Sequence, residues 1–211
     1  MNILVTAGPT REHIDRVRFI TNASSGRMGY AVAAAAREAG HEVTLLTGPV
    51  ALDAPEGVTV QRFTTVAELK HVMDACFSDC DVLVMTAAVG DFTVAEKADS
   101  KLSRRGGPVQ ITLVPTEDVL ANVAAGKGEG QFIVAFAVED GPREQIETKA
   151  RDELARKGGD IVVLNTPAAM DVDASEATIL SASETLLPWA RREKTDLAAE
   201  IIRLIDASTG T

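Results

Sequence analysis

Two patterns of apolar residues alternate along most of the chain. Short apolar runs at 3–6, 43–46, 58–63, 82–89, 132–138 and 161–164 predict β-strands. Segments with helical spacing or helix-forming composition predict helices at 26–40, 67–77, 142–157 and 192–206. The run at 82–89 is continuously apolar, which is typical of a strand buried on both faces of a parallel sheet. We therefore expect an α/β fold with a doubly wound, mostly parallel Rossmann-like sheet, in one domain over 1–211.

One stretch, residues 92–116, departs from this alternation. It is polar, rich in Lys, Arg and Gly, and holds one short apolar segment at 109–114 that predicts a strand. A connection of this length and polarity is unusual inside a compact sheet. We expect it to form a flap or arm that leaves the body of the domain.

The distribution of charge indicates small anionic ligands. The net charge of the 211 residues is −10, which excludes a uniformly basic surface for nucleic acid, and aromatic residues are only 4%. Two basic islands stand out: residues 11–27 hold four arginines against two acidic residues, and 97–105 hold four basic residues against one acidic residue. No run of 18 apolar residues and no secretory leader occurs, so we expect a cytoplasmic protein without a membrane span.

The first candidate site lies between the first strand and the first helix. The sequence S-S-G-R-M-G at 24–29 opens the helix, and Gly26 and Gly29 allow a phosphate to approach the backbone. Free N–H groups at a helix start attract anions. The dinucleotide motif G-x-G-x-x-G and the Walker motif are both absent. Simple packing at the helix start is the alternative interpretation of the two glycines.

Further candidates follow the carboxyl ends of strands, where α/β proteins bind ligands. Ala87 and Ala88 leave space for a ring or a sugar, and Asp91 can bind a ribose hydroxyl or a metal. Lys101 suits a triphosphate, and Phe136 can cover a base. The amides of Asn22 and Asn165 can hold a carbonyl group. Each residue also has a plain structural alternative, as a cap, a core residue or solvated surface.

Other catalytic classes lack their usual residues. His13, His41 and His71 are scattered without metal-ligand spacing, and no G-x-S-x-G motif or Cys–His pair is present. Cys76 and Cys80 are expected to be reduced thiols in or near a helix. The residues therefore favour anion binding and group transfer through a nucleotide over hydrolysis by a nucleophile.

Five motifs in order resemble one family. T-A-G-P-T-R-E, F-I-T-N-A-S-S-G-R-M-G, T-A-A-V-G-D-F, K-L-S-R and A-F-A-V-E-D are similar to those of the phosphopantothenoylcysteine synthetases (phosphopantothenate–cysteine ligases) of coenzyme A biosynthesis. In bacteria this is usually the carboxy-terminal domain of a bifunctional flavoprotein. The resemblance covers about residues 1–205.

The resemblance implies a two-step ligase. The carboxylate of 4′-phosphopantothenate attacks the α-phosphate of CTP (ATP being possible), pyrophosphate leaves, and L-cysteine then displaces the nucleotide monophosphate. It implies Mg²⁺ and a homodimer built with the arm. The decarboxylase half of the bifunctional flavoprotein is absent from this sequence, so no flavin is expected, and the charge and apolar patterns above lead us to expect no nucleic-acid or membrane partner. The implied catalytic residues are Asn22 and Lys101, and Asn22 also belongs to the substrate site with Arg18 and Arg27. The candidate nucleotide residues are Gly8, Thr10, Ser25, Gly26, Gly29, Ala87, Ala88, Asp91, Lys101, Arg104 and Phe136, with Asp91 also the candidate metal ligand.

The chain departs from the family pattern at three places. The arm lacks a middle lysine, Asn165 is followed by Thr166 where the family has Asp, and the loop at 170–176 is reduced. These departures leave a second hypothesis, an inactive or regulatory nucleotide-binding module on the same fold. An NAD(P)-dependent reductase is a third, disfavoured by the absent glycine motif and by the lack of an acidic residue ending the second strand.

Overall fold

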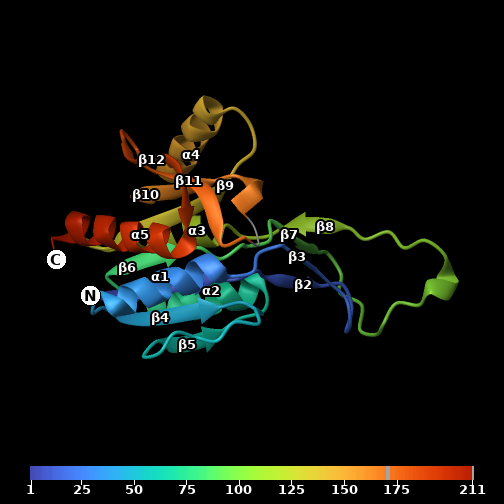
Figure 1. Cartoon of the computed structure of the whole chain (residues 1–211). Helices are drawn as coiled ribbons and strands as arrows, with labels where there is room; N and C mark the ends of the chain where they lie inside the picture. The colour runs from blue at the N-terminus through green and yellow to red at the C-terminus, as the bar shows by residue number, and fades with distance from the viewer. Residues whose placement is uncertain (170–171, 211) are drawn as a thin grey trace.

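A computed structural model of the protein describes residues 1–169 and 172–210. Within them, one eight-stranded sheet has the order β12-β11-β10-β9-β6-β1-β4-β5 (Figure 1). The six strands from β5 to β10 are parallel, and β11 and β12 form an antiparallel hairpin at one edge. The strands are β1 (Asn2–Ala7), β4 (Glu42–Thr47), β5 (Thr59–Arg62), β6 (Val82–Met85), β9 (Phe132–Val138), β10 (Ile161–Asn165), β11 (Ala174–Ser181) and β12 (Thr185–Glu193). The predicted doubly wound, mostly parallel sheet is confirmed.

Helices cover both faces of this sheet. One face packs against α1 (Arg27–Glu38) and α5 (Lys194–Thr209), the other against α2 (Val66–Cys76), α3 (Val119–Ala125) and α4 (Arg143–Lys157). Along β1 the side chains alternate: Ile3 and Val5 join the α1–α5 core, and Leu4 joins the opposite core. Because both faces are buried, the central strands are continuous apolar runs. None of the described helices is long and apolar enough to cross a membrane.

The strand order creates a crevice at one edge of the sheet. From β1 the chain moves to β4 and β5 on one side, then returns to β6 and continues to β9 and β10 on the other. The direction of winding therefore reverses between β1 and β6. In open α/β sheets ligands bind outside the carboxyl ends of strands at such a point.

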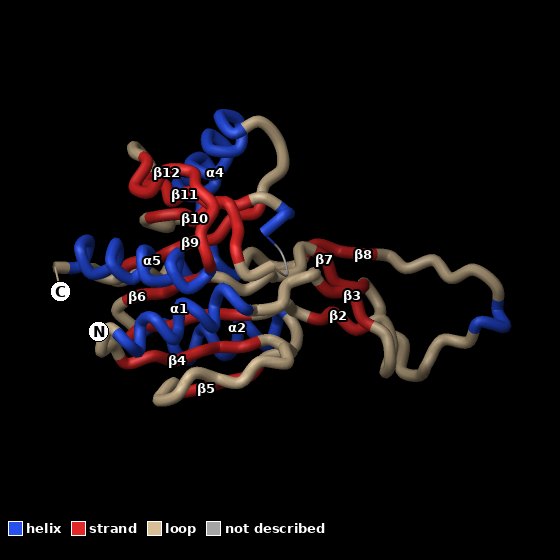
Figure 2. Tube along the Cα trace, in the orientation of Figure 1, coloured by secondary structure: helices blue, strands red, loops and turns tan. Residues whose placement is uncertain are grey.

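The predicted arm is present and leaves the body of the domain (Figures 1 and 2). Two small antiparallel sheets form its base: β2 (Arg11–His13) pairs with β3 (Phe19–Thr21), and β7 (Phe92–Val94) pairs with β8 (Leu113–Pro115). The chain between β7 and β8 extends outward to the short 3₁₀ turn η2 (Arg104–Gly106). The predicted strand at 109–114 is wrong in its bounds, since only its last two residues belong to β8.

The predicted helices lie within three residues of the observed ones, whereas several other elements differ. The strand predicted at 82–89 ends at Met85, because Ala87 and Ala88 turn out of the sheet to meet the first strand's loop. The sequence pattern did not reveal α3, the small sheets or the β11–β12 hairpin. Strands β2, β3, β7 and β8 are three residues long, too short to show a period. Strand β12 carries Pro188, which is tolerated at a sheet edge but obscures the strand pattern.

Candidate functional site

A cavity of about 780 Å³ lies over the carboxyl ends of β6, β9 and β10. Its walls come from the loop before α1, the turn after β6, the segment before α3, the end of β9 and one face of α4. Ten sequence-predicted residues line it: Asn22, Ser25, Gly26, Arg27, Gly29, Ala87, Ala88, Asp91, Phe136 and Asn165. The fold thus gathers segments that are more than one hundred residues apart in the chain.

The start of α1 forms one wall of the cavity. Gly26 is the N-cap residue in the left-handed conformation (φ 80°), and no side chain caps the helix. The hydroxyl of Ser24 accepts a hydrogen bond from the Gly26 N–H at 3.3 Å, which shapes the loop. The N–H groups of the first turn therefore face a cavity wall without a side-chain partner in the described structure, a favourable position for phosphate oxygens.

Gly29 serves close packing as well as the cavity wall. A Cβ atom built there would lie 2.4 Å from the Thr86 hydroxyl oxygen and 2.5 Å from the Ala7 Cβ. The helix α1 thus rests directly on the ends of β1 and β6. The packing alternative left open by the sequence is confirmed for this glycine, while phosphate contact at Gly29 stays a prediction.

Gly8 and Thr10 lie beneath the site and are not among the residues that line the cavity. The carbonyl oxygen of Gly8 accepts from the N–H of Ala88 at 3.0 Å. The hydroxyl of Thr10 accepts from the N–H of Gly90 at 2.9 Å, and Thr10 is 1% exposed. Both residues hold the turn after β6 in place, so the structure gives them a supporting position and no direct access to the cavity.

The Asn22 side chain joins two walls of the cavity. Its amide nitrogen donates to the carbonyl oxygens of Ala88 at 2.9 Å and Val89 at 3.1 Å. Both amide protons are therefore engaged, and the amide oxygen has no hydrogen-bond partner among the described residues. The group that Asn22 offers to a ligand in this structure is consequently an acceptor.

Asp91 is exposed and lines the cavity. Its backbone carbonyl accepts from the N–H of Thr116 at 2.9 Å, and the Thr116 hydroxyl donates to the Gly90 carbonyl at 2.6 Å. These bonds orient the turn that presents the carboxylate. In residues 1–169 and 172–210 no group of three or more His, Cys, Asp or Glu residues could hold a metal by itself.

Phe136 has the core contact that the sequence offered as one interpretation, whereas its contact with a base stays a prediction. The side chain packs partly against the α1–α5 core and also lines the cavity. Asn165, at the end of the neighbouring strand, lines the same cavity, and its amide oxygen is buried without a hydrogen-bond partner in the described part of the chain. These two residues form the part of the cavity at the ends of β9 and β10.

The charged face of α4 is a wall that the sequence analysis missed. Lys149 pairs with Glu139 at 2.7 Å, and Lys157 pairs with Asp118 at 3.1 Å. Burial alone would raise the pKa of Asp118, but the Ala121 N–H and the Lys157 ammonium outweigh it and lower that pKa. The signal was available, since residues 149, 153, 156 and 157 share one helical face directly after a strand whose carboxyl end was already a candidate.

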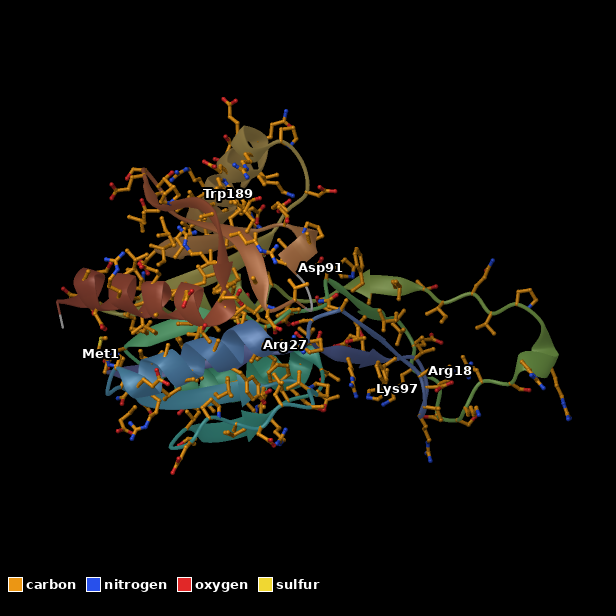
Figure 3. The ribbon with its side chains drawn as sticks, viewed as in Figure 1. Met1, Arg18, Arg27, Asp91, Lys97 and Trp189 are labelled. Atoms are coloured by element: carbon orange, nitrogen blue, oxygen red, sulfur yellow. The ribbon has the colours of Figure 1, made fainter. Side chains whose placement is uncertain are left out.

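Arg18, Lys101 and Arg104 do not line the cavity of their own chain. In Figure 3, Arg18 and Lys97 lie together on the arm, away from Arg27 and Asp91. Parts of the two basic islands therefore meet on the arm, where the Ala98 N–H donates to the Ile14 carbonyl at 2.9 Å, while Arg27 of the first island lines the cavity.

The reduced loop at 170–176 is described only in part. Met170 and Asp171 lie outside the described residues. Asp173 pairs with Arg27 at 2.7 Å, and the following residues belong to β11. The predicted loop is therefore a strand from residue 174 onward, and it contacts the candidate substrate-binding arginine.

His41 and Cys80 are buried, away from the residues that line the cavity. His41 is 4% exposed, with its Nε2 3.0 Å from a carboxylate oxygen of Asp206 on α5. Cys76 and Cys80 are free thiols, as expected. Burial raises the pKa of the Cys80 thiol to about 12, so this thiol stays protonated at neutral pH.

The chain is similar to known proteins over nearly its whole length. The family model described as DNA/pantothenate metabolism flavoprotein C-terminal domain matches residues 1–208. The coenzyme A biosynthesis bifunctional protein CoaBC of Mycobacterium tuberculosis (strain ATCC 25618 / H37Rv) is 40% identical over 214 residues, which covers 96% of this chain and 51% of that protein. A cysteine/cysteine sulfinic acid decarboxylase from an unknown prokaryotic organism is 39% identical over 208 residues, covering 96% of this chain and 57% of the relative. The chain thus spans about half the length of the curated relatives it matches.

Solved structures show the same fold. The crystal structure of the C-terminal domain of CoaBC superposes with a TM-score of 0.81 at 31% identity, covering 98% of this chain and 94% of that one. A Cab2 mutant in complex with phosphopantothenate-cysteine superposes with a TM-score of 0.83 at 18% identity, covering 99% and 86%. At that identity the second likeness concerns the fold alone.

Proposed function

Because this chain belongs to the family of the DNA/pantothenate metabolism flavoprotein C-terminal domain, we propose that it is a phosphopantothenate–cysteine ligase. The carboxylate of 4′-phosphopantothenate attacks the α-phosphorus of a nucleoside triphosphate, CTP in the first instance, and pyrophosphate leaves. The amine of L-cysteine then attacks the acyl carbon and loses a proton as the amide forms. The bond from the acyl carbon to the bridging oxygen breaks, and the nucleoside monophosphate leaves with that oxygen. The product is phosphopantothenoylcysteine.

The observation that carries this proposal is the uncapped N-terminus of α1 in the wall of a large cavity at the switch point of the sheet. A helix start of this kind stabilises phosphate oxygens through its N–H groups and its dipole. The small side chains of Ala87 and Ala88 leave room beside it for a nucleotide. In the proposed complex Asp91 binds the ribose and Phe136 contacts the base.

The residues present suit Mg²⁺ as a companion of the nucleotide. Mg²⁺ is commonly held by one or two carboxylates together with substrate phosphates and water. As the alternative to its ribose contact, the exposed carboxylate of Asp91 can supply one such ligand. When bound, the ion screens the negative charge of the phosphates.

Asn22 is placed to act on the acyl group in the second half-reaction. Its amide oxygen is available to accept a hydrogen bond from the attacking amine or from the substrate's own amide. Donation to the developing oxyanion requires one of its bonds to Ala88 or Val89 to be released. We therefore assign Asn22 to the step in which cysteine attacks the acyl-nucleotide, where its amide oxygen first accepts a hydrogen bond.

The arm is proposed to join two copies of the chain. Lys101 and Arg104 can reach a cavity only when the arm folds over or when a second copy supplies it, and Arg18 lies on the same arm. Exposed apolar side chains, which favour a protein contact, gather on this arm: Val17, Phe19, Phe92, Val109, Ile111, Leu113 and Val114. Light scattering is expected to give twice the 22.3 kDa chain mass. A monomer at micromolar concentration removes the homodimer from the proposal.

The activity test uses the purified chain with Mg²⁺, CTP or ATP, 4′-phosphopantothenate and cysteine. Pyrophosphate release that depends on phosphopantothenate, with phosphopantothenoylcysteine detected by mass spectrometry, supports the ligase. Omission of cysteine should leave the acyl-nucleotide as the last species. Tight nucleotide binding without turnover instead supports the regulatory module, and tight NADPH binding supports the reductase.

A further inference from the structure

The outer part of the arm has its last attachment to the body at Leu102. The hydrogen bonds described for residues 103–111 all stay within that segment. The attachment at Leu102 comes from the loop between β2 and β3, which holds Asp15 and Arg18. Lys101 therefore lies immediately before the point where the arm is held.

Asp15 and Arg18 bind both polar groups of the Leu102 backbone. The Leu102 N–H donates to Asp15 Oδ2 at 3.1 Å, and Arg18 Nη2 donates to the Leu102 carbonyl oxygen at 2.7 Å. Arg18 also bonds the same carboxylate through Nε at 2.9 Å and Nη2 at 2.5 Å. The result is a closed ring of hydrogen bonds, which we call the Asp15–Arg18 clasp.

The carboxylate of Asp15 is fully buried, and both of its oxygens accept hydrogen bonds. Its Oδ1 accepts from the N–H groups of Val17 at 2.7 Å and Arg18 at 2.8 Å, which closes the turn. Burial alone would raise the pKa of Asp15, but the N–H groups of Leu102, Val17 and Arg18 and the Arg18 guanidinium hold it well below its usual value. The two oxygens therefore have different partners: Oδ1 accepts the hydrogen bonds that close the turn, and Oδ2 accepts the bonds from Leu102 and Arg18 that hold the arm.

We propose that Asp15 is a positioning residue for Lys101, acting through the Arg18-assisted grip on the Leu102 backbone. The proposal rests on the proposed function, because Lys101 matters only if its ammonium acts on the nucleotide. A mispositioning of about 1 Å can cost on the order of 10²-fold in rate. Because residues 103–111 have no described hydrogen bond to the body, a lysine at position 101 would otherwise sample many positions.

Asp15→Asn separates the two tasks of the carboxylate. The amide oxygen can keep the turn bonds at the Oδ1 position, while the NH₂ group faces the Leu102 N–H and the guanidinium with donors only. Glu12→Gln is the matched control. Glu12 is a buried carboxylate on the adjoining strand that accepts from the Val66 N–H at 2.8 Å and the Thr93 hydroxyl at 2.7 Å.

The first measurement is independent of activity. Hydrogen exchange at the Leu102 amide should accelerate at least about 10-fold in Asp15→Asn, because its acceptor is lost. Trypsin cleavage after Lys101 should accelerate in parallel. In Glu12→Gln both rates should stay within about twofold of the wild type. Unchanged exchange at Leu102 in Asp15→Asn overturns the clasp.

The second measurement is a double-mutant cycle on pyrophosphate release. Asp15→Asn alone should lower kcat about 10- to 10²-fold with KM for CTP changed much less, and it should have little further effect in the K101Q background. Equal factors in the two backgrounds overturn the positioning role while leaving the proposed function intact. If the wild-type chain releases no pyrophosphate, the proposed function fails and the positioning role fails with it.

Discussion

Replacement of Gly29 by alanine tests the close packing of the start of α1 against the ends of β1 and β6, which forms one wall of the cavity. The added Cβ would lie 2.4 Å from Thr86 Oγ1, 2.5 Å from Ala7 Cβ and 2.9 Å from the Thr6 carbonyl oxygen. Non-bonded heavy atoms rest at about 3.5–4.0 Å, so roughly 1 Å of clearance is missing. The Thr6 oxygen belongs to the backbone of β1 and Ala7 is fully buried, so the strain falls on α1.

The size of the effect follows from two opposing terms. Overpacking of a core costs about 1–3 kcal/mol, and the helix gains at most about 1 kcal/mol when alanine replaces glycine. Since two of the three contacted groups cannot move away easily, we expect a net loss of about 1–2 kcal/mol. For a chain of this size that corresponds to a fall in Tm of about 2–8 °C. Displacement of the α1 start should also weaken CTP binding.

Urea unfolding, followed by circular dichroism and by fluorescence of Trp189, the single tryptophan, measures the stability term. Gly40→Ala is the control, because Gly40 has φ +89° and its Cβ would meet no atom within 4 Å. Its cost of about 1–2 kcal/mol comes from the left-handed backbone alone and should leave CTP binding unchanged. If Gly29→Ala is as stable as the wild type and binds CTP equally well, the close packing of α1 on the strand ends is not a constraint.

Four further predictions concern single groups. Lys101→Gln should lower pyrophosphate release about 10²- to 10³-fold with Tm nearly unchanged, because the side chain is exposed; a near-normal rate would make it a surface residue. Asn22→Asp keeps an acceptor oxygen but loses the amide group that holds the side chain to the Ala88 and Val89 carbonyls, and its new charge would face those carbonyls. The displaced carboxylate should therefore slow the second half-reaction, so that pyrophosphate is released and the acyl-nucleotide accumulates in quenched samples, and stability should fall. Loss of pyrophosphate release without an intermediate would contradict this. A maleimide at pH 7 should label Cys76 alone in the folded protein and both cysteines in urea, since Cys80 is buried with a raised pKa; labelling of two thiols in the native state would contradict the burial argument. Folding lowers the pKa of Asp15, so the stabilisation by its carboxylate is present above the ordinary carboxylate pKa of about 4 and is lost as the pH falls below that value. The urea midpoints of the wild type and Asp15→Asn should therefore converge in acid. A difference between the midpoints that stays constant down to pH 2 would contradict this.

Local periodicity was enough to predict the body of the fold. The pattern of apolar residues within a segment reflects which of its faces are buried. This local signal was sufficient to predict β1, β4, β6, β9 and β10 and the helices between them. The S-S-G-R-M-G loop at the start of α1 was likewise visible, because a helix start is a local feature. The glycines there could be assigned to the site but not divided between phosphate approach and packing.

Only the tertiary structure decided which candidates meet. The order of the strands brings Asn22 against Ala88 and places the charged face of α4 over the same cavity, while Thr10 is left beneath it. The grip of Asp15 on Leu102 joins residues 87 positions apart in the chain. Such contacts depend on strand order and on turns between distant segments, and a sequence period carries no information about either. The period of a segment records whether it is buried, whereas its partners are set by the path of the whole chain.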